Sequence, residues 1–237
     1  MGTWFQTIGD LRYSRISNAY RSFGVLEGLY ASVRMALCPL LDIEAALPAN
    51  GAFVDVGCGA GLLLQWLALG QNSKEYQLVG MEIDSRRVDL GRRVCEKLGI
   101  ASRVDLYVKS FGRGSNRRDL DAVIFIDVLH HMNYNLQKSM ITYAFESLAD
   151  GGILLIKDVG DRPILKYYYN YIFDAMTHIT RITHGKSGYY RSQSGWEKLL
   201  REQGFYTSVI EIKHIDFAPH IMLVGKKVKA TPYAEQS

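Results

Sequence analysis

The amino-acid sequence predicts an α/β fold in which helices cover both faces of a doubly wound, mostly parallel β-sheet. An apolar run ends in Val54–Gly61, VDVGCGAG, and a leucine-rich helical pattern begins directly after it. This order indicates a strand, a tight loop and a helix. The run Asp121–Asp127, DAVIFID, is almost continuously apolar, as expected for a strand covered on both faces. Strand-like and helix-like patterns alternate between and beyond these two segments.

The first element, the loop with glycines at 57, 59 and 61, suits close contact with a ligand. Glycine turns where a Cβ would clash and lets backbone N–H groups approach a ligand, and the following helix N-terminus adds a partial positive charge. A dinucleotide fingerprint would place Gly or Ala where Leu62 stands. Asp55 would also lie unfavourably beside a pyrophosphate. We therefore expect a nucleotide-like ligand with a cationic end.

The second strand is predicted at Tyr76–Met81, and Glu82 stands at its C-terminal end. Such folds place a ribose-binding carboxylate at about this distance from the glycine loop. Asp84 is a weaker candidate for the same role, because an acid beside the predicted helix Ser85–Leu98 can simply favour the helix dipole.

Residues 1–50 precede the first strand, and we expect them to form a helical N-terminal extension. Apolar residues at helical spacing predict a helix that ends before Pro39 and packs on the core: Leu26, Leu29, Tyr30, Val33 and Leu37. The stretch upstream is rich in aromatic residues and arginines. Two interpretations stay open for it, a flexible lid over the site and an ordinary helical extension with aromatics in the core.

A third strand over Val104–Val108 leads to Ser110 and Phe111, and the fourth strand, Asp121–Asp127, is expected beside the first. Its C-terminal end then opens on the crevice where ligands bind in this fold. His130 and His131 follow it, and an imidazole with a pKa of about 6.5 can act as a general base. Sequence neighbours point differently, so at most one is expected to be catalytic. Alternatively, both histidines only pack or cap.

We expect Lys157 and Asp158 to leave the fifth strand on the crevice side, where they either bind substrate or form an internal ion pair. The segment 159–193 is expected to be a helical, substrate-side insertion, with a helix from Pro163. Tyr189 and Tyr190 offer flat walls with hydroxyl groups for an acceptor. The alternative is a helix that packs on the core or on a second subunit.

The chain closes with a helix, two strands and a tail. Ser194 and Glu197 form a predicted capping box for a helix that ends at Gly204. The strands are expected around Val209–Ile210 and Ile221–Val224. We expect residues 230–237 to be a disordered tail.

Composition limits the alternatives. A chain of 237 residues with 48% hydrophobic residues suits one α/β domain with an insertion. The net charge is +4, and the basic residues are scattered along the chain with acidic residues between them, so nucleic acid is not an expected partner. Cys38, Cys58 and Cys95 fit no metal-ligand spacing and read as reduced thiols. Because no apolar run reaches about 18 residues, we expect a soluble, cytoplasmic protein without a metal site or a transmembrane segment.

Four segments together resemble class I S-adenosylmethionine-dependent methyltransferases: VDVGCGAG, VGMEIDSRRV, DVLHHM and the L-x-D-G-G turn before the fifth strand. The resemblance implies a cofactor-binding domain over residues 51–229 and a seven-stranded sheet whose last strand is antiparallel. It implies that Asp55 holds the methionine moiety, that Glu82 binds the ribose, and that Ser110 and Phe111 flank the adenine. The implied cofactor residues are Asp55, Gly57, Cys58, Gly59, Gly61, Glu82, Ile83, Ser110, Phe111, Asp127 and Val128.

The resemblance also implies the reaction, an in-line attack of an acceptor on the sulfonium methyl group. The N-methyltransferases of nucleic-acid bases carry an Asn/Asp-Pro-Pro-aromatic motif after the fourth strand, which this sequence lacks. We therefore expect O-methylation of a small molecule, aromatic or carrier-bound, in a bacterial secondary-metabolite or lipid-type pathway. His130 or His131 would be the base, and Lys157, Asp158, Tyr189 and Tyr190 would bind the acceptor. The alternatives are an RNA or protein methyltransferase and an inactive cofactor-binding partner; a homodimer is also open.

Overall fold

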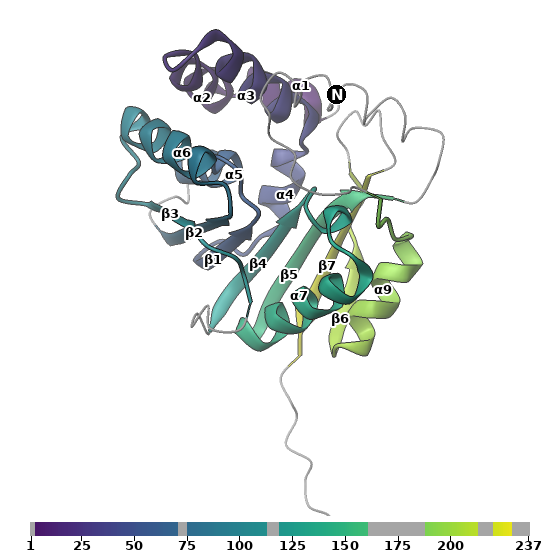
Figure 1. The fold of residues 1–237 in the computed structure, drawn as a ribbon. Coiled ribbons are helices and arrows are strands. Elements are labelled where there is room, and N and C mark those ends of the chain that lie inside the picture. The colour runs from purple at the N-terminus through teal and green to yellow at the C-terminus, as the bar shows by residue number, and fades with distance from the viewer. Residues whose placement is uncertain (1–2, 71–74, 113–118, 161–187, 213–219, 229–237) are drawn as a thin grey trace, which may run out of the picture.

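A seven-stranded sheet forms the centre of the computed structural model, which describes residues 3–70, 75–112, 119–160, 188–212 and 220–228. The strand order is β3-β2-β1-β4-β5-β7-β6 (Figure 1). Strands β1 to β5 run parallel, whereas β7 is antiparallel to both β5 and β6. The predicted doubly wound sheet with an antiparallel last strand is thus confirmed. The strands are β1 Gly51–Val56, β2 Tyr76–Glu82, β3 Val104–Val108, β4 Leu120–Ile126, β5 Leu148–Val159, β6 Phe205–Val209 and β7 His220–Lys227.

Helices cover both faces of this sheet, so alternate strand residues enter two separate cores. Along β4, Ala122 and Ile124 belong to one hydrophobic cluster, and Val123 and Phe125 to the other. The continuous apolar run of this strand reflects that two-sided burial. The first cluster lies under α5 Leu62–Ala68 and α6 Ser85–Leu98, and the second under α7 Tyr134–Ser147 and α9 Gln193–Glu202.

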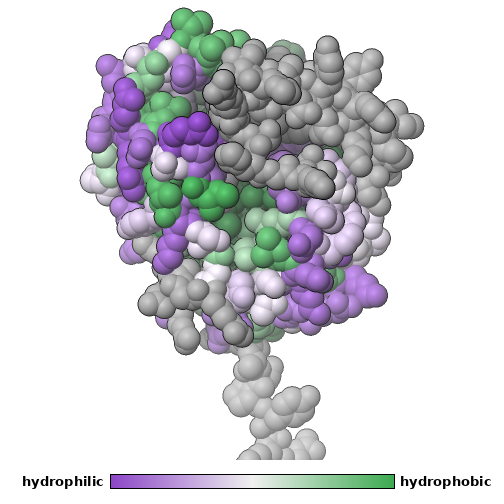
Figure 2. All heavy atoms as spheres, in the orientation of Figure 1, coloured by the Kyte–Doolittle hydropathy of each residue, from purple (hydrophilic) through white to green (hydrophobic). Residues whose placement is uncertain are grey.

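The N-terminal extension is helical: α1 Thr3–Gly9, α2 Leu11–Arg21, α3 Val25–Leu37 and α4 Leu40–Ala46. The expectation that Leu26 and Leu29 pack on the core is wrong, because these side chains are 52% and 55% exposed. Figure 2 shows apolar residues at the surface at the top of the view, over these helices. The buried face of α3 carries Gly28, Ala31 and Met35. Helix α2 passes so close that a Cβ at Gly28 would lie 2.9 Å from Arg21 Cα, so small residues form the contact.

A half-buried ionic and aromatic cluster fastens α2 and α4 to α5, which packs on the sheet. Arg12 of α2 donates to both carboxylate oxygens of Glu44 on α4 at 2.9 Å. Its guanidinium also lies 4.0 Å from the centre of the Trp66 ring on α5, and Trp66 Nε1 donates to Glu44. The N-terminal extension is therefore packed into the fold through these contacts.

The start of α9 differs from its prediction. Ser192, with extended backbone angles, is the N-cap and its Oγ accepts from Gly195 N at 3.1 Å. Ser194 already lies inside the first turn, so the predicted capping box at Ser194 is wrong by two residues. The expected helix from Pro163 and the expected tail lie outside the described residues. No helix within the described ranges combines the length and apolarity needed to cross a bilayer.

Candidate functional site

The glycine loop after β1 adopts a backbone that other residues rarely tolerate. Gly57, Gly59 and Gly61 have φ angles of +72°, +58° and +78°. A Cβ at Gly57 would lie 2.5 Å from Val128 Cγ2, so glycine is required there also for close approach to the turn after β4. The loop is held to β2 because Gly57 N donates to Met81 O at 2.8 Å. It therefore forms a fixed wall beside the ends of β1 and β4.

A cavity of about 380 Å³ lies against this loop, at the C-terminal ends of β1, β2 and β4. Most of the residues expected to bind the cofactor line it: Gly57, Cys58, Gly59, Glu82, Ile83, Ser110, Phe111, Asp127 and Val128. Gly61 does not line it but turns the chain into α5. Phe111 is 3% exposed and packs edge-on against Phe125, at 6.1 Å between ring centroids.

Glu82 is fixed at the cavity wall by three backbone donors. Its Oε2 accepts from Gly59 N at 3.0 Å, and its Oε1 accepts from Ile83 N at 2.7 Å and Asp84 N at 3.1 Å. The side chain is only 7% exposed. Asp84 instead caps α6 by accepting from Arg86 N. This agrees with the expectation that an acid at this position favours the start of the helix. The carboxylate of Glu82 thus joins the glycine loop to the end of β2.

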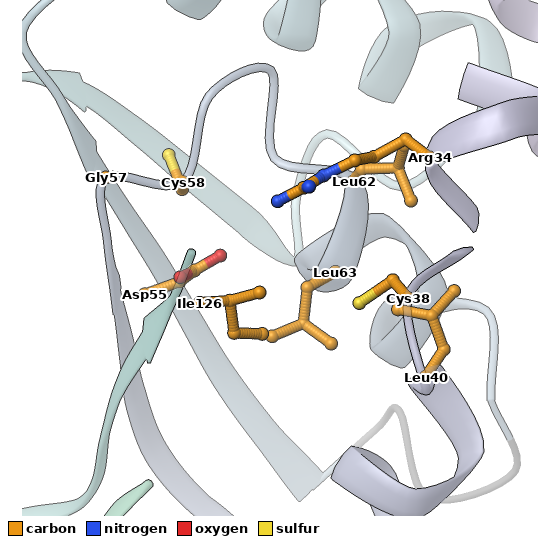
Figure 3. A pocket seen from close by; sticks show the side chains of 9 residues that line it. All are labelled: Arg34, Cys38, Leu40, Asp55, Gly57, Cys58, Leu62, Leu63 and Ile126. Carbon is orange, nitrogen blue, oxygen red and sulfur yellow. The ribbon is translucent and has the colours of Figure 1, made fainter. Parts of the chain in front are cut away.

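Asp55 lies in a smaller adjoining cavity of about 50 Å³ that Arg34, Cys38 and Cys58 also line. Figure 3 shows Arg34 reaching from α3 toward the loop that carries Cys58 and toward Asp55. Burial raises the pKa of Asp55 to about 7, Arg34 opposes this rise, and Glu82 adds to it. A cation placed beside Asp55 would keep it ionised, so this cavity favours the positive end of a ligand.

Asp127, at the end of β4, lies between two cations. Lys157 Nζ contacts its carboxylate oxygens at 2.8 and 3.0 Å, and Arg34 Nη2 contacts one of them at 2.9 Å. Burial alone would raise the pKa of Asp127, but Lys157 and Arg34 outweigh it and hold this pKa well below its usual range. Asp127 also has a positive φ of 52°, which is uncommon outside glycine. Lys157 is 1% exposed and lines neither cavity.

The two histidines occupy different environments. His130 Nδ1 lies 2.5 Å from Asp158 Oδ1, and His130 N donates to Asp158 Oδ2 at 3.1 Å. Burial by itself lowers the pKa of His130, but the hydrogen bond and charge of Asp158 outweigh it and raise this pKa above its ordinary value. Burial lowers the pKa of His131 to about 4, and the adjacent His130 adds to the effect. His131 lines the large cavity, whereas His130 does not.

Tyr189 and Tyr190 lie beside this histidine turn but line neither of the two cavities described above, so their expected contact with an acceptor stays a prediction. The Tyr190 ring is parallel to the His130 ring within 7°, with centroids 5.6 Å apart. The Tyr189 ring meets Tyr134 edge-on at 5.6 Å. Asp158 is 1% exposed. It pairs with His130, and Lys157 pairs with Asp127, so these two neighbours on β5 have separate partners.

Sequence reasoning did not identify several residues that line the large cavity. The N-terminal helices contribute Tyr20, Tyr30 and Arg34. Tyr20 is fully buried and its hydroxyl donates to Ala60 O at 3.2 Å. Three further unpredicted wall residues follow β4: Met132, Leu136 and Met140. Their positions in ordinary apolar helical patterns carry no signal that marks them as ligand contacts.

Comparison with known proteins gives consistent matches. The family described as a methyltransferase domain matches residues 31–209. A bacteriochlorophyllide d C-20 methyltransferase from Chlorobaculum tepidum is 25% identical over 206 residues, which cover 83% of this chain and 55% of that protein. The chain thus spans about half the length of this curated relative.

Two solved structures resemble the fold. An O-methyltransferase family protein from Burkholderia thailandensis aligns with a TM-score of 0.65 at 17% identity, over 87% of this chain and 60% of the other. An O-methyltransferase family 2 protein from Planctomyces limnophilus, in complex with apigenin, aligns with a TM-score of 0.62 at 16% identity, over 90% and 62%. At such identities these likenesses establish the fold.

Proposed function

Because the chain belongs to the methyltransferase-domain family, whose cofactor is S-adenosylmethionine, we propose that it methylates a hydroxyl group of a small aromatic acceptor. The bound cofactor supplies an electrophilic methyl group on a sulfonium ion. The chain's own residues must then bind the cofactor, orient the acceptor and accept the proton that the hydroxyl loses.

The cavity walls fit the cofactor's chemistry. Glu82 accepts three backbone hydrogen bonds, two at Oε1 and one at Oε2, so Oε2 still has capacity to accept a bond from a ribose hydroxyl. Asp55 offers a buried carboxylate to the cationic end. Ile83 and Phe111 offer apolar contacts for the adenine. We assign these roles to this chain on that fit.

The single observation that carries the acceptor chemistry is the buried pair of His130 and Asp158. The carboxylate keeps a proton on Nδ1, so Nε2 is left to accept the acceptor's proton, and Asp158 stabilises the imidazolium that forms. We assign His130 as the base. His131, whose pKa of about 4 keeps it neutral, forms part of the cavity wall.

The rings around His130 support a flat acceptor. Tyr190 stacks on His130, Tyr134 meets Tyr189 edge-on, and aromatic walls suit a conjugated molecule. Two of the similar proteins have names that print a molecule with conjugated rings, bacteriochlorophyllide d and apigenin. Since the first of them is a C-20 methyltransferase, methylation of an aromatic carbon is the second candidate.

The test combines a phenol panel, RNA and lysate protein with methyl-labelled cofactor, and locates the label by mass spectrometry and NMR. We expect His130→Gln to lower kcat by about 10²- to 10⁴-fold, His131→Gln to lower it much less, and Asp158→Asn to approach His130→Gln. Affinity for S-adenosylhomocysteine should hold in all of them. Equal, small losses for both histidines would contradict the assignment, and a label on carbon would favour the second candidate.

A further inference from the structure

The segment Gly188–Arg191, here called the tyrosine segment, is fastened to the turn that carries the histidines. Gly188 N and Tyr189 N both donate to His130 O, at 3.4 and 3.3 Å. Tyr134 Oη at the start of α7 donates to Tyr190 O at 3.2 Å. These bonds bring the Tyr190 ring onto one face of the His130 imidazole.

Gln137 lies at the centre of this attachment. Its side chain is fully buried, and Nε2 lies 2.8 Å from Tyr189 O, 3.0 Å from Leu129 O and 3.1 Å from Met132 O. On its other side, Oε1 accepts from Arg191 Nε at 2.6 Å. A side-chain amide offers both kinds of hydrogen-bonding group at one place: here the NH2 group faces three carbonyls, and the oxygen faces a guanidinium. Gln137 therefore links the histidine turn to the tyrosine segment at two points.

Arg191 adds to the attachment through its flat guanidinium. Its Cζ lies 4.7 Å from the centroid of the Tyr134 ring and 5.4 Å from that of Trp196. Such cation–π contacts hold the guanidinium in place, so Arg191 presents Nε to Gln137 in one orientation. The tyrosine segment is then fixed by α7 on one side and by α9 on the other.

The result is that the His130 ring is enclosed by its neighbours. Tyr190 stacks on one face, and the His131 ring lies 4.1 Å away at 45°, while His130 as a whole is 8% exposed. We propose that Gln137 is a positioning residue for the methyl transfer, which keeps Tyr190 over His130 and so holds the base in one orientation and away from water. The kinetic part of this inference rests on the proposed function.

The test uses Gln137→Met in the full chain, because methionine nearly matches the shape of glutamine and removes all four hydrogen bonds. Acylation of each histidine by diethyl pyrocarbonate is followed by mass spectrometry. We expect His130 to react about tenfold faster than in the wild type, with the other histidines unchanged. With an accepted phenol, kcat should fall about 10- to 100-fold, while the affinity for S-adenosylhomocysteine stays within about twofold.

Gln203→Met is the matched control. Gln203 also bonds α7, by accepting from Thr142 Oγ1 at 2.6 Å, but five residues further along this helix than Gln137. It should leave the reactivity of His130 and kcat unchanged. Should Gln137→Met fail to fold, Tyr134→Phe removes only the hydroxyl that holds Tyr190 O, and a faster reaction of His130 is again expected.

Two outcomes would overturn the inference. One is an unchanged reaction rate of His130 in folded Gln137→Met or Tyr134→Phe. The other is faster acylation of every histidine, which would mean general loosening rather than positioning. If no phenol is methylated by the wild type, the proposed function fails, but the acylation pattern of His130 still decides whether Gln137 positions Tyr190.

Discussion

Replacing Asp55 with asparagine should stabilise the cofactor-free protein at alkaline pH. Burial raises the pKa of Asp55 from an ordinary 3.8 to about 7, so the folded state binds this proton more tightly than the unfolded state does. The stability that this group contributes is complete below about pH 4 and is lost as the pH rises through 7. Asparagine carries no charge at any of these pH values.

The size of the effect follows from the same shift. A pKa raised by about three units costs the folded state about 4 kcal/mol once the carboxyl is ionised. Because asparagine must also bury a polar amide, and because Arg34 then loses one of its neighbouring carboxylates, we expect a net gain of about 2 to 3 kcal/mol at pH 8. For a chain of this size that raises Tm by roughly 5 to 10 °C.

The assay is thermal unfolding of wild type and Asp55→Asn at pH 5 and pH 8, without cofactor. The gain should be large at pH 8 and small at pH 5, where the wild-type carboxyl keeps its proton. The same variant should bind S-adenosylmethionine more weakly by about 1.5 to 3 kcal/mol in calorimetry. A variant no more stable than wild type at pH 8, or a gain equal at both pH values, would refute the reasoning.

Three further changes test other contacts of the site and its support. Glu82→Gln replaces one acceptor of its backbone hydrogen bonds by a donor, so S-adenosylhomocysteine affinity in calorimetry should fall about 10- to 100-fold, and NADH should not compete in either protein. Lys157→Met leaves the buried Asp127 with one cation fewer, so urea unfolding should show a loss of about 3 to 5 kcal/mol; a neutral result would mean that Arg34 alone balances this charge. Glu44→Gln weakens the contacts of this residue to Trp66 and Arg12, so urea unfolding should show a loss of about 1 to 2 kcal/mol.

The sheet and the cavity wall around the glycine loop were predictable because their signals are local. The glycines at 57, 59 and 61 follow a strand directly, and each has the left-handed backbone that makes glycine necessary. Glu82 stands at the end of the next strand, where parallel pairing with β1 brings it to the loop. Short stretches of sequence therefore specify this half of the site.

The remaining contacts depend on which distant segments meet. Nothing in the pattern of α3 distinguishes Arg34, which reaches the site only because α3 docks beside β4. Likewise, Gly28 rather than Leu29 faces the core since α2 requires close approach, a property of two helices together. The pairing of His130 with Asp158 was closer to prediction, because His130 follows β4 and Asp158 lies at the C-terminal end of the neighbouring strand β5, but the sequence alone left Asp158 a choice of partners.

The contribution of the N-terminal helices to the cavity has a consequence for the order of folding. The hydroxyl of Tyr20 bonds a carbonyl 40 residues further on, and Arg12 bonds a carboxylate 32 residues further on. Arg34 pairs with Asp127, which comes directly after β4, the fourth strand in chain order. During synthesis these helices leave the ribosome before the central strands do, so the contacts of Tyr20 and Arg34 can form only after their partners have followed. We therefore expect these helices to dock late in folding, so that the large cavity has its full wall only at the end.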